Sequence, residues 1–143
     1  MARKIYESDE NRKNERRLAK AWERLFNVEC SKLPFSYFLD FVCERDGKII
    51  HILEVRKRNI NIADHDTHMI SMKKVQHAKE LTDVLGVPCY LLFEYKDGCY
   101  YIDMAQQPDY YNKWGRMTKE SWRGDSADIE IMAHWSKDRF IKL

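Results

Sequence analysis

Two apolar runs joined by an Asp-Gly turn place the strongest constraint on how this chain folds. The first run, 35–43, is rich in aromatic and β-branched residues, and the second run, 49–55, is mostly aliphatic. Asp46 and Gly47 stand between them, and this pair of residues is typical of a tight hairpin turn. The sequence therefore predicts a β-hairpin over residues 35–55.

The rest of the chain shows alternating helix and strand signals. Apolar spacing predicts helices over 8–27 and 71–85, the second ended by Gly86. Further strands are expected at 88–95, 99–103 and 127–135, with an irregular stretch at 59–68 and a surface loop at 104–125. The passage from 49–55 to 88–95 is long enough for a parallel crossover. The expected order, α-β-β-α-β-β-loop-β, indicates an α/β or α+β fold with one mixed central β-sheet flanked by helices.

Composition bounds the class of protein. The 143 residues make one domain, 1–143, and 44% hydrophobic content is enough for a core. The 25 basic and 23 acidic residues leave a net charge of +2, which argues against disorder driven by charge. No apolar run approaches the ~18 residues of a membrane span, and no leader is visible. We expect no membrane association, a cytoplasmic protein, and reduced thiols at the four cysteines, whose spacing matches no zinc motif.

Two acids interrupt the strands of the expected hairpin. Counting from the turn places Asp40 opposite Leu53 and next to Glu54, whereas a bulge would place the two acids opposite each other. Two carboxylates at one end of a hairpin repel each other unless a cation lies between them. A hard divalent ion, Mg²⁺ or Mn²⁺, is one occupant that fits. The alternative is that each acid pairs with an arginine or lies at a solvated strand end.

The order of these residues resembles the PD-(D/E)XK nucleases, which have the restriction-endonuclease-like fold. The likeness runs from about residue 10 to residue 103 and is strongest to compact phage and resolvase-related members. Four motifs in order carry it: Asn14-Glu15-Arg16, Asp40-Phe41, Glu54-Val55-Arg56-Lys57-Arg58 and Lys74-Val75-Gln76-His77-Ala78.

The resemblance implies a Mg²⁺- or Mn²⁺-dependent DNA endonuclease, of phage origin and therefore in the host cytoplasm. Asp40, Glu54 and the Val55 carbonyl would hold the metal, and Glu15 would act as an outer ligand or orient a metal-bound water. Glu23 is a weaker rival for that first-helix acid. Phosphate or base contacts are expected from Arg16, Lys57, Arg58, Lys73 and Gln76. DNA is the implied partner, and the resemblance leaves a homodimer open.

Arg56 stands where the family has its catalytic lysine. Arginine keeps the charge but essentially never releases its proton, so it can stabilise a phosphate but cannot act as a base. Lys57 should point to the opposite face of the strand. Lys74, on the following helix, is the better substitute. Two readings follow: a nuclease in which Arg56 and Lys74 share the role, or a catalytically inactive nuclease fold that binds DNA or has a structural part.

Other patterns carry less weight. His65 and His68 could hold zinc if they lay on one helix, and the aromatic residues could stack on bases, namely Tyr100, Tyr101, Tyr110, Tyr111, Trp114 and Trp122. Residues 104–143 could serve as a dimer surface or a specificity element. A third hypothesis is an α+β domain without nuclease activity, in which the two acids are structural.

Overall fold

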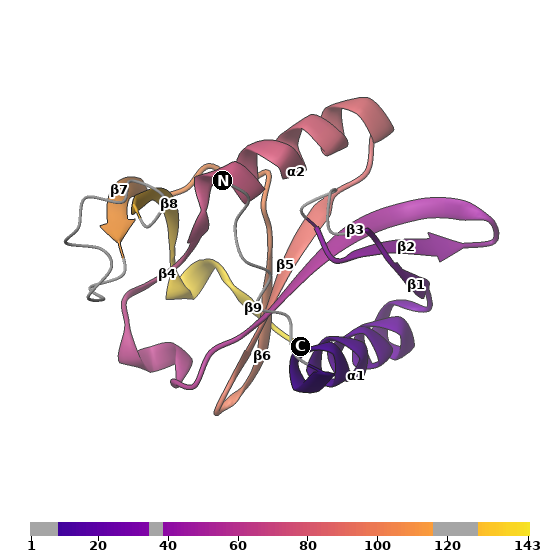
Figure 1. The fold of residues 1–143 in the computed structure, drawn as a ribbon, viewed down its shortest axis with the longest axis horizontal. Coiled ribbons are helices and arrows are strands. Elements are labelled where there is room, and N and C mark those ends of the chain that lie inside the picture. The colour runs from indigo at the N-terminus through magenta and orange to yellow at the C-terminus, as the bar shows by residue number, and fades with distance from the viewer. Residues whose placement is uncertain (1–8, 35–38, 116–128) are drawn as a thin grey trace.

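A computed structural model describes residues 9–34, 39–115 and 129–143, which form two β-sheets and two α-helices (Figure 1). The larger sheet has six strands in the order β1-β2-β3-β5-β6-β9, and the smaller has three in the order β4-β8-β7. The helices are α1 (Asp9–Phe26) and α2 (Met72–Leu85). The strands of the larger sheet are β1 (Glu29–Lys32), β2 (Phe41–Arg45), β3 (Lys48–Lys57), β5 (Cys89–Tyr95), β6 (Gly98–Asp103) and β9 (Ile141–Lys142). Those of the smaller sheet are β4 (Thr67–Ser71), β7 (Tyr110–Gly115) and β8 (Ile129–Ser136).

The predicted hairpin is formed by β2 and β3, and it contains the bulge that aligns the two acids. Asp46 and Gly47 both have positive φ, 52° and 77°, as a tight turn of this kind requires. The antiparallel register shifts by one residue between Cys43 and Glu44, so that Phe41 pairs with Leu53. Continued by one residue, this register places Asp40 level with Glu54. The second of the two predicted registers is therefore confirmed.

The crossover and the two helices also agree with the sequence. β3 pairs in parallel with β5, and the connection between them contains β4 and α2. Helix α1 ends at Phe26 and is followed by Asn27 in the left-handed conformation, with φ of 52°. Gly86 ends α2 with φ of 69°, and its N–H donates to the Thr82 carbonyl. The architecture is a mixed α+β fold around a central mixed sheet, as expected.

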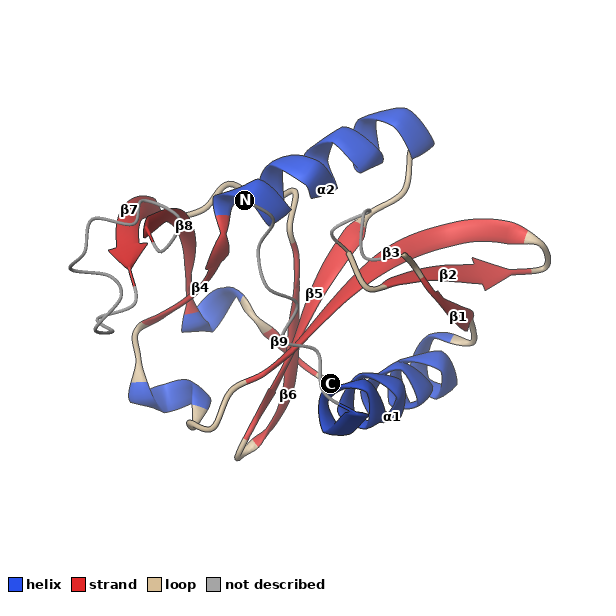
Figure 2. Ribbon diagram, in the orientation of Figure 1, coloured by secondary structure: helices blue, strands red, loops and turns tan. Residues whose placement is uncertain are grey.

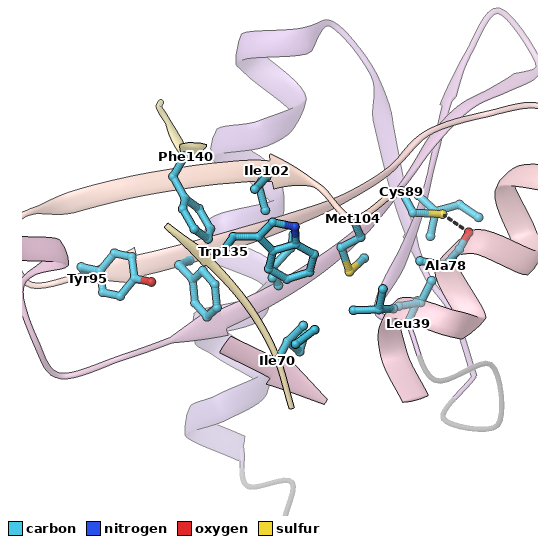
Figure 3. Close-up of a cluster of buried hydrophobic side chains, with 14 residues drawn as sticks. Leu39, Ile70, Ala78, Cys89, Tyr95, Ile102, Met104, Trp135 and Phe140 are labelled. Carbon is cyan, nitrogen blue, oxygen red and sulfur yellow. Dashed lines mark hydrogen bonds between the residues drawn. The ribbon is translucent and has the colours of Figure 1, made fainter. Parts of the chain in front are cut away.

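The larger sheet separates two hydrophobic clusters, with α1 on one face and α2 with the smaller sheet on the other (Figure 2). Successive residues of a strand point to opposite faces, so neighbours on β3 and β5 divide between the clusters. Leu53 and Leu92 pack with Trp22 of α1. Leu91 packs in the other cluster with Trp135 of β8, where Figure 3 shows Met104, Ile70 and Phe140 gathered around the indole. This arrangement leaves Glu54 on the α2 face of β3.

Several strands were not predicted. β1 lies between the expected helix 8–27 and the apolar run 35–43, β4 overlaps the stretch expected to be irregular, and β7 lies inside the expected loop 104–125. β2 spans Phe41–Arg45, and the part of the predicted strand at 35–38 lies outside the described residues, as do residues 116–128. β4 and β7 both pair with β8, which is distant in sequence, so local periodicity does not report them. Within the described ranges, no helix is long and apolar enough to cross a membrane.

Candidate active site

Asp40 sits at the entrance to β2, where its carboxylate is held by two donors. Its Oδ2 accepts a hydrogen bond from the Val55 backbone N–H at 2.9 Å, and its Oδ1 accepts one from Lys32 Nζ at 3.2 Å. The residue is only 8% exposed. The Val55 side chain belongs to the core on the α1 face, so its carbonyl is the group it can offer to a ligand. The hairpin thus fixes Asp40 directly against the backbone of the strand that carries Glu54.

Glu54 is fully buried and is surrounded by charges. Lys74 Nζ of α2 lies 2.9 Å from its Oε2, and Arg56 Nη1 lies 3.3 Å from its Oε1. Within the part of the chain that the structure describes, neither oxygen has a hydrogen bond of good geometry. A carboxylate removed from water in this way is costly unless it is neutralised. Glu54 is therefore a group that a bound cation would stabilise.

The pKa values of the two acids move in opposite directions. Burial raises the pKa of Glu54 to about 8 and the nearby Asp40 carboxyl adds to this rise, while Arg56 and Lys74 oppose it. Burial also tends to raise the pKa of Asp40, but the adjacent Glu54 carboxyl, the hydrogen bond from the Val55 N–H and the charges of Arg56 and Lys32 hold it below its ordinary value. The two carboxyls therefore differ in how readily they ionise, as closely placed acids do.

Arg56 and Lys74, the two candidates for the role of the family's lysine, both lie beside Glu54. Arg56 follows Glu54 by two positions on β3 and so points to the same face, whereas Lys57 is exposed. The pKa of Arg56 is raised chiefly by Glu54, against the effect of burial, and Asp40, Glu15 and Glu130 add to the rise. Glu130, at the start of β8, is an acid near this site that sequence reasoning did not find.

Glu15 reaches the pair through Lys32. Lys32 Nζ lies 2.7 Å from Glu15 Oε2 and 3.2 Å from Asp40 Oδ1, and so bridges α1 and the hairpin. Sequence reasoning missed Lys32 because β1 was not expected. Only the pairing of β1 with β2, which sets Lys32 opposite Phe41, brings this lysine to Asp40.

The residues predicted to contact DNA differ in how exposed they are. Arg16 on α1, Lys57 on β3 and both Lys73 and Gln76 on α2 are exposed. Arg58 is half-buried instead, with its guanidinium 5.5 Å from the centre of the Phe93 ring. Burial, and then the charge of Arg56, lower the pKa of Arg58. Arg58 is therefore less available to phosphate than the other four.

The weaker candidates have structural partners. His68 is buried, its Nε2 is 2.8 Å from the Ile62 carbonyl, and its ring contacts Tyr95. Tyr101 packs edge-on against Trp22 in the core on the α1 face. Tyr110 is stacked on His134 but stays 45% exposed. Trp122 is outside the described residues.

A family model described as "Phage putative PDDEXK endonuclease" matches the chain over residues 1–143. The chain belongs to this family. A search of curated protein sequences found no match.

The fold of this PDDEXK family member is similar to a solved structure, the Holliday junction resolvase Hjc of the archaeal hyperthermophile Archaeoglobus fulgidus. The TM-score is 0.51, with 13% sequence identity, over 68% of this chain and 74% of that one. At this identity the likeness concerns the fold alone, and it confirms the expected nuclease-like core.

The oxygen donors of this PDDEXK site fit a hydrated hard cation. Asp40 and Glu54 offer two carboxylates, and the Val55 carbonyl adds a neutral oxygen. Among the described residues, no group of three or more His, Cys, Asp or Glu side chains is placed to hold a metal ion. Mg²⁺ is commonly bound by one or two carboxylates with several waters and substrate phosphates. The incompletely bonded oxygens of Glu54 support the fit.

Proposed function

We propose that this protein is a divalent-metal-dependent DNA endonuclease that hydrolyses phosphodiester bonds with Mg²⁺ or Mn²⁺. One observation carries the proposal: the fully buried Glu54 carboxyl meets Asp40 at the end of the hairpin, with Arg56 and Lys74 beside it. A fully buried carboxylate next to a second acid is a group that a divalent cation would stabilise. Membership of the PDDEXK family supports the same reaction class.

Each residue of the site has a role that follows from its position. Asp40 and Glu54, with the Val55 carbonyl, would hold the ion, which when bound lowers the pKa of a water and polarises the scissile phosphate. The Val55 N–H keeps the Asp40 carboxylate in place. Arg56 keeps its proton, so it would stabilise charge on the phosphate, and Lys74 would do the same from α2. Glu15, which is paired with Lys32, would act as an outer ligand of the ion or orient a water bound to it.

The surface around the site would bind the DNA backbone. We assign phosphate contacts to Arg16, Lys57 and Lys73, a polar contact to Gln76, and a lesser part to Arg58, which is packed on Phe93. As a member of a phage endonuclease family, the protein would act in the host cytoplasm. A homodimer is open, and multi-angle light scattering of the free protein and of its DNA complex measures it.

The test is DNA cleavage in the presence of Mg²⁺ or Mn²⁺. Linear duplex, single-stranded and four-way-junction DNA are incubated with the protein, because the structural neighbour is a junction resolvase. We expect cleavage of at least one substrate, loss of cleavage in EDTA, and a loss of about 10²-fold or more in Asp40→Asn and Glu54→Gln. Cleavage that persists in both variants would show that these acids do not form the site.

A second candidate is a nuclease fold that binds DNA without cutting it. Arg56 in place of the usual lysine favours this function, as does the engagement of both Glu54 oxygens by protein cations. Retention of DNA without cleavage, in wild type and in Arg56→Lys, would support it. A gain of cleavage in Arg56→Lys would show that the arginine limits an otherwise intact site.

A further inference from the structure

Lys32 stands between the acids of the site and solvent. Its Nζ is bound to Glu15 Oε2 and Asp40 Oδ1, and it lies 5.3 Å from the centre of the Phe41 ring. The Lys32 side chain is 45% exposed, compared with 32% for the Arg56 side chain and 21% for the Lys74 side chain. Lys32 is therefore the most accessible of the three cations that pair with acids here.

A basic hollow of ≈ 280 Å³ adjoins this ammonium group, lined by Arg12, Glu15, Arg16, Lys32 and Phe41. Three of these five side chains are basic and one is acidic. A water molecule takes about 30 Å³ of liquid volume, so the hollow has room for a phosphodiester group with its hydration. Its charge suits an anion of this class.

Lys32 already offsets negative charge at the edge of the site. Its ammonium group is paired with both Glu15 and Asp40. A divalent ion on Asp40 would add two positive charges close to the Lys32 ammonium. Like charges at such short range repel each other strongly near a protein surface, so this exposed lysine would be driven away from Asp40.

We propose that Lys32 couples ion binding at Asp40 to the binding of a DNA backbone phosphate in the adjacent hollow. The inference rests on the proposed function and names a binding site and a partner contact within it. Released from Asp40, the Lys32 ammonium turns into the hollow and binds the phosphate together with Arg12 and Arg16. Conversely, a phosphate in the hollow draws Lys32 away and makes ion binding easier. Such coupling is reciprocal by necessity.

Titration with Ca²⁺ as a probe ion measures the coupling without relying on activity. Isothermal titration calorimetry gives the Ca²⁺ affinity of the free protein and of its complex with a 20-base-pair duplex, and a gel of the same samples confirms that the DNA is intact. For wild type we expect DNA to tighten Ca²⁺ binding by about 5–150-fold. In Lys32→Met the free protein should bind Ca²⁺ more tightly, and the effect of DNA should fall at least threefold.

Matched variants separate the role of Lys32 from a general change of charge. Lys20→Met removes the same charge from an exposed position of α1 and should leave both affinities unchanged. Lys32→Arg keeps the charge and should retain the coupling. Circular dichroism checks each fold, and Lys32→Gln replaces Lys32→Met if that variant does not fold. Unchanged coupling in the folded Lys32 variants overturns the inference.

The salt dependence of DNA binding provides a second measurement. Each phosphate contact contributes about 0.9 to the slope of log affinity against log salt concentration. The slopes of wild type and Lys32→Met should therefore differ by about 0.9 in Ca²⁺ and agree in EDTA. Equal slopes in Ca²⁺, or the same difference in EDTA, contradict the movement of Lys32. If wild type binds neither DNA nor Ca²⁺, the proposed function itself fails, whereas binding of both without coupling rejects only the inference.

Discussion

Burial governs the pKa of Glu54 at this site, whereas hydrogen bonding and nearby charges govern that of Asp40. Glu54 is 0% exposed, and its pKa is raised to about 8 even though Arg56 and Lys74 lie beside it. Asp40, held by the Val55 N–H and Lys32, moves the other way. One buried acid that is hard to ionise next to one that ionises readily is an arrangement found where proteins do chemistry, although structural networks also produce it. The cations beside Glu54 are therefore the residues to test.

Lys74 and Lys73 form a matched pair for this test. Lys74 Nζ lies 2.9 Å from Glu54, whereas its neighbour Lys73 is exposed on α2. We expect Lys74→Met to lower kcat/KM for DNA cleavage by about 10²-fold, because it removes a charge aimed at the reacting phosphate. Lys73→Met should weaken DNA binding only slightly. Equal effects of the two substitutions on kcat would contradict the role given to Lys74.

His51 carries a pH dependence of stability away from the site. Trp22 Nε1 donates to His51 Nε2 at 2.6 Å, and burial, then the charge of Arg45, lower the pKa of His51 to about 4. As pH falls from about 6.5 to about 4, the unfolded chain takes up a proton that the folded His51 refuses. The unfolded state then binds more protons, so this residue should cost the fold about 2–3 kcal/mol over that range.

Urea unfolding at pH 7, 6, 5 and 4.5 measures this effect. His51→Gln leaves an acceptor for Trp22 but does not titrate, so its free energy of unfolding should fall less steeply with pH than that of wild type. His77→Gln, at a partly exposed position of α2, is the control. A wild-type slope in the His51 variant would show that other groups cause the acid sensitivity.

Site residues that stand out within their own stretch of sequence could be predicted. Site residues that reach the site only because distant strands pair could not. Asp40 and Glu54 stand out because each is an acid within an apolar run, and the turn between them limits the register to two choices. Lys74 was found through a family motif. Lys32 and Glu130 have no such local signal. Lys32 comes near Asp40 only because β1 pairs with β2, and Glu130 comes near Arg56 only because β8 returns to this part of the fold.

The same distinction holds for whole elements. α1, α2, the β2–β3 hairpin and the β5–β6 hairpin have strong local periodicity or turn residues, and each was predicted. β4 and β7 pair with β8 across long intervals of sequence, and β9 has only two residues that pair with β6. Strands of this kind depend on packing partners more than on their own composition, so a single sequence does not reveal them.

The junction between α1 and the hairpin offers a test at the scale of elements. Arg45, beside the turn of the hairpin, donates from Nε to the Asn27 carbonyl at 2.9 Å and from Nη2 to the Phe26 carbonyl. These carbonyls lie at the C-terminal end of α1, where a cation is favoured. We expect Arg45→Ala to lower the free energy of unfolding by about 1 kcal/mol in urea titration. Its cross-strand partner Lys48, also exposed, should change it by less than about 0.5 kcal/mol when replaced by alanine.

For the whole molecule, the decisive feature is that one sheet is shared by two hydrophobic clusters. Neighbouring residues of β3 and β5 belong to opposite clusters, so neither cluster can lose its packing without disturbing the strands that support the other. Glu54 lies on one of these strands. The geometry of the site therefore depends on both sides of the sheet.

Leu91 and Leu92 test whether the two clusters unfold as one unit. Both are 0% exposed on β5, but Leu91 packs toward Trp135 and Leu92 toward Trp22. Each leucine-to-alanine change should cost about 2–5 kcal/mol, since it leaves a cavity in a closely packed core. Because the strands are shared, far-UV circular dichroism and tryptophan fluorescence should give the same urea midpoint in each variant. Different midpoints for the two signals in Leu92→Ala would show that the hydrophobic cluster on the α1 face unfolds while the cluster on the α2 face stays folded. The Asp40–Glu54 pair would then be supported from one face of the sheet only.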